Sequence, residues 1–190
     1  MHFGGIRLAR EPLASRLLSL AEAQRAGGGH ISYDANFRRS VDTARYAPTF
    51  ERLCRLADVI KLSDEDLRGL MPGLDAEAAL RRVRSFNARA WLLYTEGAAG
   101  ASLITSEGRW RAAAPPVAVV DTVGAGDASI AGLVASRVLR PQAGAATHLA
   151  FAVAAGSAAC QTEGVHPPLR AAVQSLMQGR STARPCSNTG

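Results

Sequence analysis

The sequence predicts an α/β fold with a mainly parallel sheet. Short apolar segments typical of buried strands alternate along the chain with longer segments whose apolar residues have helical spacing. A second observation is the apolar run Val117–Val120, which predicts a buried strand and precedes a turn containing Gly124 and Gly126 and then an Ala-rich helix. This order points backbone N–H groups at an anion. The sequence therefore predicts a phosphate site within residues 121–127.

The first half of the chain alternates between short strands and helices. A strand end is expected at 2–6, and the leucine spacing of 12–26 predicts a helix that three glycines terminate. Further on, apolar runs predict strands, and amphipathic spacing or acidic first turns predict helices. The expected strands are 30–33 and 58–62, and the expected helices are 48–57, a short one from Ser63, and 75–88.

The second half continues the pattern with a buried strand at 90–94 and a hairpin. The hairpin strands are expected at 100–105 and 110–113, separated by the turn at Gly108. Helices then follow the glycine turn, and Pro141 ends the first of them. The expected helices are 127–139, 147–160 and 168–178, and a disordered polar tail is expected at 179–190.

Length and composition exclude several classes of protein. At 190 residues and 47% hydrophobic content, the chain is one domain or part of a larger one. Polar residues and proline interrupt the uncharged stretch 141–162, so it predicts a buried helix and no membrane span. No signal peptide is visible. The three widely spaced cysteines predict neither a zinc site nor a disulfide framework, which favours the cytoplasm.

The net charge of +6 raises the possibility of nucleic-acid binding. However, the arginines are scattered among acidic residues in helical segments, and aromatic residues make up only 5% of the chain. No basic cluster is interleaved with aromatic residues, so we expect no nucleic-acid partner. A mildly basic surface equally suits an enzyme that binds anionic nucleotides.

Two known phosphate motifs fail at the glycine turn. A P-loop needs Gly-Lys-Ser/Thr, but Lys61 is the only lysine in the chain. A dinucleotide fingerprint needs a third glycine where Ser129 stands, and an acid about 20 residues later. No acid lies between Asp127 and Glu163. Asp127, at the start of the helix, is instead a candidate proton acceptor for an attacking hydroxyl.

The segment 121–127, Asp-Thr-Val-Gly-Ala-Gly-Asp, resembles the Asp-Thr-x-Gly-Ala-Gly-Asp signature of the ribokinase-like (PfkB) sugar kinases at every fixed place. The resemblance implies a ribokinase-like three-layer sandwich and transfer of the γ-phosphate of ATP to a sugar hydroxyl. The nearest members are fructokinase-like. It also implies that Asp127 is the base and contacts the sugar. The backbone amides at Gly124, Ala125 and Gly126 would stabilise the transferring phosphate.

A second segment of the resemblance is Asp34-Ala35-Asn36-Phe37-Arg38. It is similar to the Asp-Pro-Asn-x-Arg segment of fructokinase-like members, with Ala35 in place of proline. The resemblance implies that Asn36 and Arg38 bind the substrate, near the sugar and the transferred phosphate. A simpler interpretation is an Asx-turn followed by a solvated arginine.

Two weaker matches concern the nucleotide and magnesium. Residues Ser63 and Asp66 hold the places of the family's Asn-x-x-Glu, which implies nucleotide binding by Ser63 and a water-mediated magnesium contact by Asp66. Helix capping alone also explains both residues. Thr95 and Gly97 match a Thr-x-Gly that approaches the nucleotide in the family, although a turn before a hairpin explains them equally well.

The last matching region is 147–165, which flanks the adenine in the family. Val153 falls at a nucleotide-binding place where many members have Asn. Gly164 matches a glycine of the loop that helps to hold a monovalent cation such as K⁺, and Asp121 is assigned to the same cation. His148 and His166 lack metal-ligand spacing, and both are interpreted as structural.

The resemblance covers residues 1–178 as a partial kinase domain, with the N-terminal part and the β-lid of the family pattern missing. Two consequences are expected. An exposed sheet edge would favour a homodimer or aggregation. The expected partners are ATP, Mg²⁺ and a sugar. The missing segments leave open whether the chain is an active kinase. The alternative is an inactive kinase remnant that serves as a nucleotide-binding or interaction module.

Overall fold

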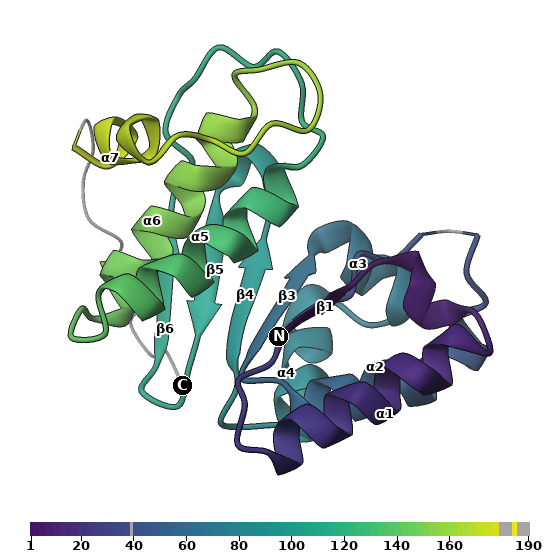
Figure 1. Ribbon diagram of the computed structural model, residues 1–190. Helices are drawn as coiled ribbons and strands as arrows, with labels where there is room; N and C mark the ends of the chain where they lie inside the picture. Colours follow the sequence, from purple (N-terminus) through teal and green to yellow (C-terminus); the bar gives the residue numbers. More distant parts are fainter. Residues whose placement is uncertain (39, 179–183, 186–190) are drawn as a thin grey trace. The chain divides into compact units, whose positions relative to one another are not determined.

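The computed structural model describes residues 1–38, 40–178 and 184–185, and the chain divides into two compact units (Figure 1). Unit 1 is Met1–Leu93 and unit 2 is Tyr94–Gly190. The boundary falls within strand β4 (Trp91–Thr95). Of the tail expected at 179–190, only Arg184–Pro185 lies within the described residues, as the short strand β7.

Unit 1 contains a parallel sheet. Its strands β1 (His2–Gly4), β2 (Ser32–Asp34) and β3 (Val59–Ser63) pair in that order. All three residues of β2 and the first four of β3 are buried, which fits parallel strands covered on both faces. The helices of this unit are η1 (Ile6–Ala9), α1 (Leu13–Ala26), α2 (Thr43–Leu56), α3 (Asp64–Leu70) and α4 (Ala76–Phe86).

Side-chain caps set where the helices of unit 1 begin. The Asp42 carboxylate accepts the Arg45 N–H, so α2 begins at Thr43, five residues before the start expected at Pro48. The Asn87 amide closes the other end: its Nδ2 donates to the carbonyls of Cys54, Arg55 and Ala57. Local polar contacts therefore connect α2 to the end of α4.

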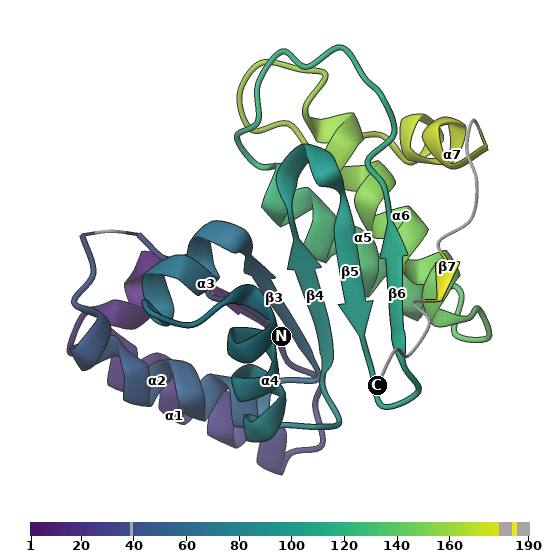
Figure 2. The same ribbon diagram turned by 180° about the vertical axis from the view of Figure 1, so that it is seen from behind.

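Unit 2 has an antiparallel sheet, seen from behind in Figure 2. Strand β5 (Ala101–Ile104) pairs with β6 (Arg109–Ala112), which also pairs with β7. The helices are η2 (Gly97–Ala99), α5 (Ala125–Leu139), α6 (Ala145–Ala159) and α7 (Arg170–Gln178). Helix α6 packs against β5, β6, α5 and α7, so it forms the centre of this unit.

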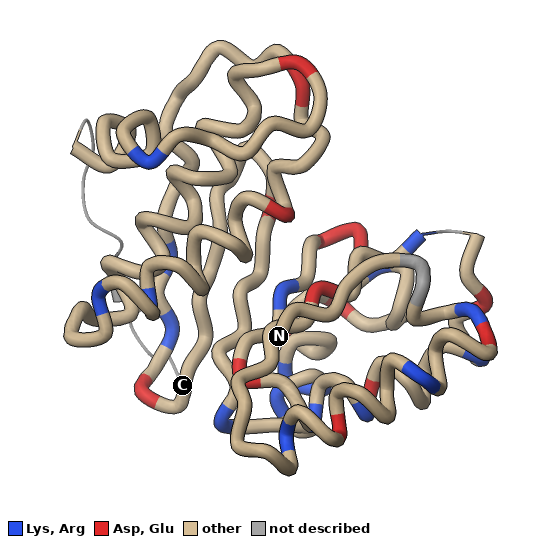
Figure 3. The backbone as a smooth tube through the Cα atoms, viewed as in Figure 1, with Lys and Arg blue, Asp and Glu red and all other residues tan. Residues whose placement is uncertain are grey.

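Small residues allow α5 and α6 to pack closely. A Cβ placed on Gly132 of α5 would lie 2.8 Å from the Ala155 Cβ of α6. A Cβ on Gly156 of α6 would collide with the Ser129 hydroxyl of α5. Figure 3 shows almost no charge along this helix pair, in contrast to the charged α1 and α2 of unit 1. The Ala-rich pattern therefore forms a tightly packed apolar scaffold behind the glycine turn.

The expected buried strand at Val117–Val120 is wrong. These residues form no strand, and the side chains of Val119 and Val120 are 62% and 61% exposed. One backbone bond holds the segment, from the Val120 N–H to the Cys160 carbonyl at 2.8 Å. An apolar run of four residues has strand propensity, but a strand also needs a partner edge.

None of the helices in the described part of the chain combines the length and the hydropathy that a membrane span requires.

Candidate active site

The loop after β2 carries two of the predicted substrate-binding residues. Asp34 is 1% exposed, and its Oδ1 accepts the Asn36 N–H at 3.0 Å, which makes the Asx-turn of the simpler interpretation. Asn36 has a φ of +40°, in the left-handed region that non-glycine residues rarely adopt. The next N–H, of Phe37, donates to Asp66 Oδ1 at 2.7 Å, and Arg38 is exposed. The loop is therefore held through its backbone.

Ser63 and Asp66 form a reciprocal capping box at the start of α3. The Ser63 hydroxyl accepts the Asp66 N–H at 3.0 Å, and Asp66 Oδ2 accepts the Ser63 N–H at 2.7 Å. This is the capping interpretation of the sequence, and it is confirmed. Asp66 is 3% exposed, and both of its oxygens already accept backbone N–H groups.

A buried lysine lies beside these carboxylates. Lys61 of β3 is 6% exposed, and its Nζ lies 3.2 Å from Asp34 Oδ1 and 3.8 Å from Asp66 Oδ2. Its role is not apparent from any motif, although one signal is visible in the sequence. Lys61 is a charged residue in the middle of the apolar run 59–62. A charge inside a buried strand requires a partner of opposite sign.

Thr95 and Gly97 lie where β4 ends and unit 2 begins to turn. Gly97 has a φ of +57° and opens η2, and Gly100 has a φ of +98°. The Glu96 N–H donates to the Gly100 carbonyl at 2.9 Å, which closes the turn before β5. The hairpin-turn interpretation is thus confirmed, and the nucleotide role of both residues stays a prediction.

The glycine turn leads directly into α5. Gly124 is the N-cap, with a left-handed φ of +82° that its lack of a Cβ permits. The Ala125 N–H donates to the Thr122 carbonyl, and the helical bonds begin with the Ala128 N–H. The Gly126 and Asp127 N–H groups fall in the first turn, where a helix offers no intrahelical acceptor. These N–H donors suit an anionic ligand, and the exposed Asp127 carboxylate beside them is open to a substrate hydroxyl.

The segment before this turn is tied to the loop after α6. Asp121 Oδ1 accepts the Val123 N–H and Oδ2 accepts the Gly164 N–H, each at 3.0 Å. These donors hold the pKa of Asp121 below its usual range. The Cys160 carbonyl accepts the Asp121 N–H as well. The two residues that the resemblance assigns to a monovalent cation, Asp121 and Gly164, therefore lie together.

Val153 and His148 both lie inside α6. Val153 is buried in the apolar core of unit 2, so its side chain packs there. His148 Nδ1 and the Ser136 hydroxyl of α5 are 2.9 Å apart, and burial lowers the pKa of His148. The structural interpretation of His148 fits these contacts.

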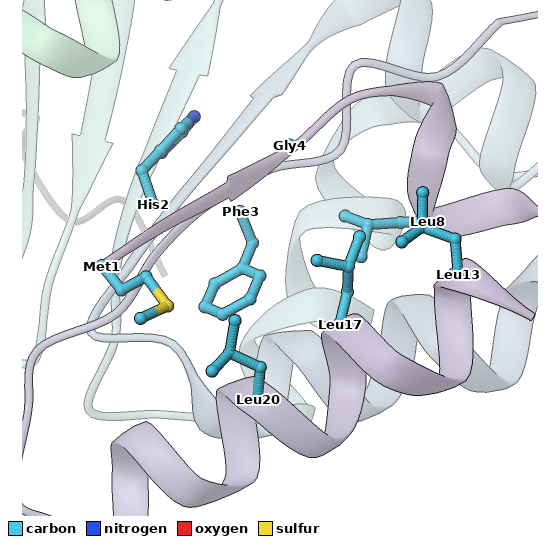
Figure 4. Close-up of a pocket in the computed structure, with 8 residues that line it drawn as sticks. All are labelled: Met1, His2, Phe3, Gly4, Leu8, Leu13, Leu17 and Leu20. Atoms are coloured by element: carbon cyan, nitrogen blue, oxygen red, sulfur yellow. The ribbon is translucent and has the colours of Figure 1, made fainter.

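A cavity of about 340 Å³ lies in unit 1, between β1 and α1. Figure 4 shows the Phe3 ring of β1 directed toward the leucines of α1. Apolar side chains dominate its walls, and the lining residues are Met1, His2, Phe3, Gly4, Leu8, Leu13, Leu17 and Leu20. No residue assigned to the sugar or the nucleotide is among them.

Similarity to solved structures defines the class of this protein. An aminoimidazole riboside kinase from Salmonella enterica superimposes with a TM-score of 0.82 at 28% identity, over 94% of this chain and 62% of that one. A fructokinase from Vibrio cholerae O395, solved with fructose, ADP and calcium bound, gives 0.81 at 29% identity, over 93% and 59%. The predicted ribokinase-like α/β sandwich is confirmed.

Sequence similarity then identifies the family. Residues 1–172 match the pfkB family carbohydrate kinase profile, and the chain belongs to this family. A fructokinase from Salmonella thompson is 36% identical over 138 residues, which are 72% of this chain and 62% of that protein. Two further fructokinases are matched over 45% of their length, so the chain spans about half the length of the curated relatives it matches.

Proposed function

We propose that this protein transfers the γ-phosphate of ATP to a hydroxyl of a sugar, with fructose as the first acceptor to test. The observation that carries the proposal is the exposed carboxylate of Asp127 in the first turn of α5. It follows Gly126 directly in the sequence, and Gly124, with its left-handed φ, is the N-cap of the same helix. The identity with fructokinases supports fructose as the acceptor. So does the Vibrio cholerae fructokinase with fructose and ADP bound.

In the proposed reaction the Asp127 carboxylate takes the proton of the acceptor hydroxyl. The hydroxyl oxygen forms a bond to the γ-phosphorus, and ADP leaves with the electrons of the broken bond. The amides of Gly124, Gly126 and Asp127 donate to the phosphoryl oxygens, where negative charge is spread during transfer, whereas the Ala125 N–H, also expected there, already donates to the Thr122 carbonyl. The family resemblance assigns Asn36 and Arg38 to the acceptor, and the planar guanidinium of Arg38 suits phosphate oxygens. The resemblance assigns Ser63, Thr95 and Gly97 to the nucleotide, and it assigns Val153 too, although the Val153 side chain is buried in the core of unit 2.

Asp66 does not suit direct coordination of magnesium. Both of its oxygens already accept backbone N–H groups, Oδ1 from Phe37 and Oδ2 from Ser63. Magnesium that arrives with ATP keeps water and phosphate ligands, and it neutralises phosphate charge. The contact of Asp66 through water stays a prediction.

A monovalent cation fits the donor chemistry better. The Gly164 N–H donates to Asp121 Oδ2, so the two segments lie together, and the backbone carbonyl oxygens of loops suit hard cations. A double mutant of the Vibrio cholerae fructokinase was solved with fructose, ADP and a potassium ion. We therefore assign K⁺ to this loop pair, and replacing K⁺ by tetramethylammonium in the assay should lower the rate.

The test is ADP release by the full chain with ATP and magnesium, measured with fructose, with aminoimidazole riboside and without acceptor. Acceptor-dependent ADP release would support the kinase function. If calorimetry shows ATP binding but no tested sugar gives ADP release, the kinase function is overturned and the nucleotide-binding remnant is favoured. Sedimentation velocity on the same sample tests the expected self-association, for which the apolar side chains around the β1 edge offer a surface.

A further inference from the structure

The one lysine of the chain is buried, although arginine occupies every other basic position apart from the histidines. Lys61 lies in β3 between Ile60 and Leu62, which are fully buried. A lysine ammonium is a compact charge on a flexible stem, and a guanidinium needs more space and a planar partner. The use of lysine here therefore matches a small charged space inside unit 1.

That space is bounded by two carboxylates. The Nζ of Lys61 lies 3.2 Å from Asp34 Oδ1 and 3.8 Å from Asp66 Oδ2, and all three side chains are buried. Asp34 Oδ2 has no hydrogen-bond partner within the described part of the chain. Without the ammonium, two buried negative charges would face each other with no cation to offset them, which is strongly unfavourable.

The same two carboxylates hold the loop that follows β2. Asp34 Oδ1 accepts the Asn36 N–H, and Asp66 Oδ1 accepts the Phe37 N–H. Between these bonds Asn36 has its left-handed φ, which the surrounding structure must impose. From the other side, the Phe37 ring packs so closely on Gly69 of α3 that a Cβ there would collide with it. The loop conformation thus depends on where both carboxylates lie.

We propose that Lys61 is a positioning residue that sets the conformation of loop 35–38 for acceptor binding by holding the carboxylates of Asp34 and Asp66 against that loop. The inference rests on the proposed kinase function. Lys61 itself is too deeply buried to touch a substrate. It acts through the backbone bonds at Asn36 and Phe37, and so on the direction in which Asn36 and Arg38 leave the loop.

The first measurement needs no activity. Hydrogen exchange by NMR reports the Asn36 and Phe37 amides separately from the rest of unit 1. In Lys61→Met these two amides are expected to exchange at least 10-fold faster, while amides of β2 and α2 change less. Asn87→Ala is the matched control, because it removes three hydrogen bonds in unit 1 at the end of α2, away from this loop. Unchanged protection of Asn36 and Phe37 in Lys61→Met would overturn the proposal.

The second measurement is kinetic. Lys61→Met is expected to raise the KM for the acceptor about 10-fold or more and to leave the KM for ATP within about twofold, whereas Asn87→Ala should change neither. An equal rise of both KM values in Lys61→Met would overturn the proposal. If the wild-type chain releases no ADP with any acceptor, the kinase function fails, and the amide exchange still decides whether Lys61 positions the loop.

A double variant tests the charge argument and covers the case in which Lys61→Met does not fold. Adding Asp34→Asn removes one of the two carboxylates that Lys61 faces, and it keeps an Oδ1 that can accept the Asn36 N–H. Lys61→Met/Asp34→Asn is therefore expected to fold and to recover most of the protection at Asn36 and Phe37. If it is no better folded or protected than the single variant, positioning by charge is wrong.

Discussion

Two aspartates begin the two candidate loops, Asp34 in unit 1 and Asp121 in unit 2, and they make the same local bond. In each, Oδ1 accepts the N–H two residues later, at 3.0 Å. The second oxygens differ. Asp121 Oδ2 accepts the Gly164 N–H, whereas Asp34 Oδ2 is buried without a hydrogen-bond partner in the part of the chain that the structure describes.

The different surroundings move the two pKa values in opposite directions. Burial raises the pKa of Asp34 to about 6, against the lowering effect of Lys61. The N–H groups of Val123 and Gly164 lower the pKa of Asp121, which is only partly buried. One local motif therefore serves two purposes. In unit 1 it is part of a buried charge network, and in unit 2 it ties two surface loops together.

Asp127→Asn should give the largest effect, because it tests the one acid that the proposal places in the chemistry. The kcat of acceptor-dependent ADP release is expected to fall about 10²-fold or more, with little change in ATP affinity, since a positioned base contributes roughly 10²–10⁴-fold. Glu77→Gln, in the first turn of α4, is the control and should keep the wild-type rate. Near wild-type turnover in Asp127→Asn would remove the catalytic assignment.

Gly132→Val should break the scaffold behind the exposed loop. The new side chain meets Ala155 Cβ within 2.8 Å and the α6 backbone within 3.4 Å, so α5 and α6 must separate. We expect the free energy of unfolding to fall by about 3 kcal/mol, at the upper end for overpacked cores. Ala131→Val, at the exposed neighbouring position, should cost less than about 1 kcal/mol. Urea denaturation measures both, and equal losses would contradict the close packing.

Asp34→Asn tests the effect of the raised pKa of Asp34 on stability. The folded pKa of about 6 lies above the unfolded value of 3.8, so the folded state binds the proton more tightly. Wild-type stability should therefore fall as the pH rises from about 4 to about 6, by on the order of 2 kcal/mol. Asp34→Asn should lose this component, and Asp121→Asn should retain it. Denaturation at several pH values tests this, and identical pH dependence of Asp34→Asn and wild type would refute it.

Asp58→Asn should give the smallest effect, with the opposite sign. Burial raises the pKa of Asp58, but the Ile31 N–H and the Arg25 guanidinium outweigh burial and lower it. Its contribution is thus present above the unfolded pKa and is lost as the pH falls through the lower folded value. The pair is partly exposed, so solvent screening limits the ion-pair share to about 1 kcal/mol or less. The variant should be less stable than wild type at pH 7 and closer to it near pH 3.

Several local features could be predicted from residues close together in the sequence. The capping box at Ser63 and Asp66, the Asx-turn at Asp34 and the entry of the glycine turn into α5 depend on bonds between residues two to four apart. Such bonds need only the local chain, which explains why the sequence predicted them. The strand expected at Val117–Val120 failed because pairing depends on a distant partner.

The role of Lys61 could not be derived from the sequence. Its partners are 27 residues before it and five residues after it, and the pattern shows only that a charge interrupts an apolar run. Likewise, the tie between Asp121 and Gly164 joins residues 43 apart. Contacts at such separations depend on how the strands and helices pack.

By itself the sequence determined the α/β class, the glycine turn and the position of Asp127 at a helix start, because backbone geometry and capping act over a few residues. Only the tertiary structure decided which carboxylates are buried and which donors reach them. Burial raises the pKa of Asp34, whereas the nearby Val123 N–H and the distant Gly164 N–H lower the pKa of Asp121, because burial and the donors that reach a carboxylate control the stability of its ionised form.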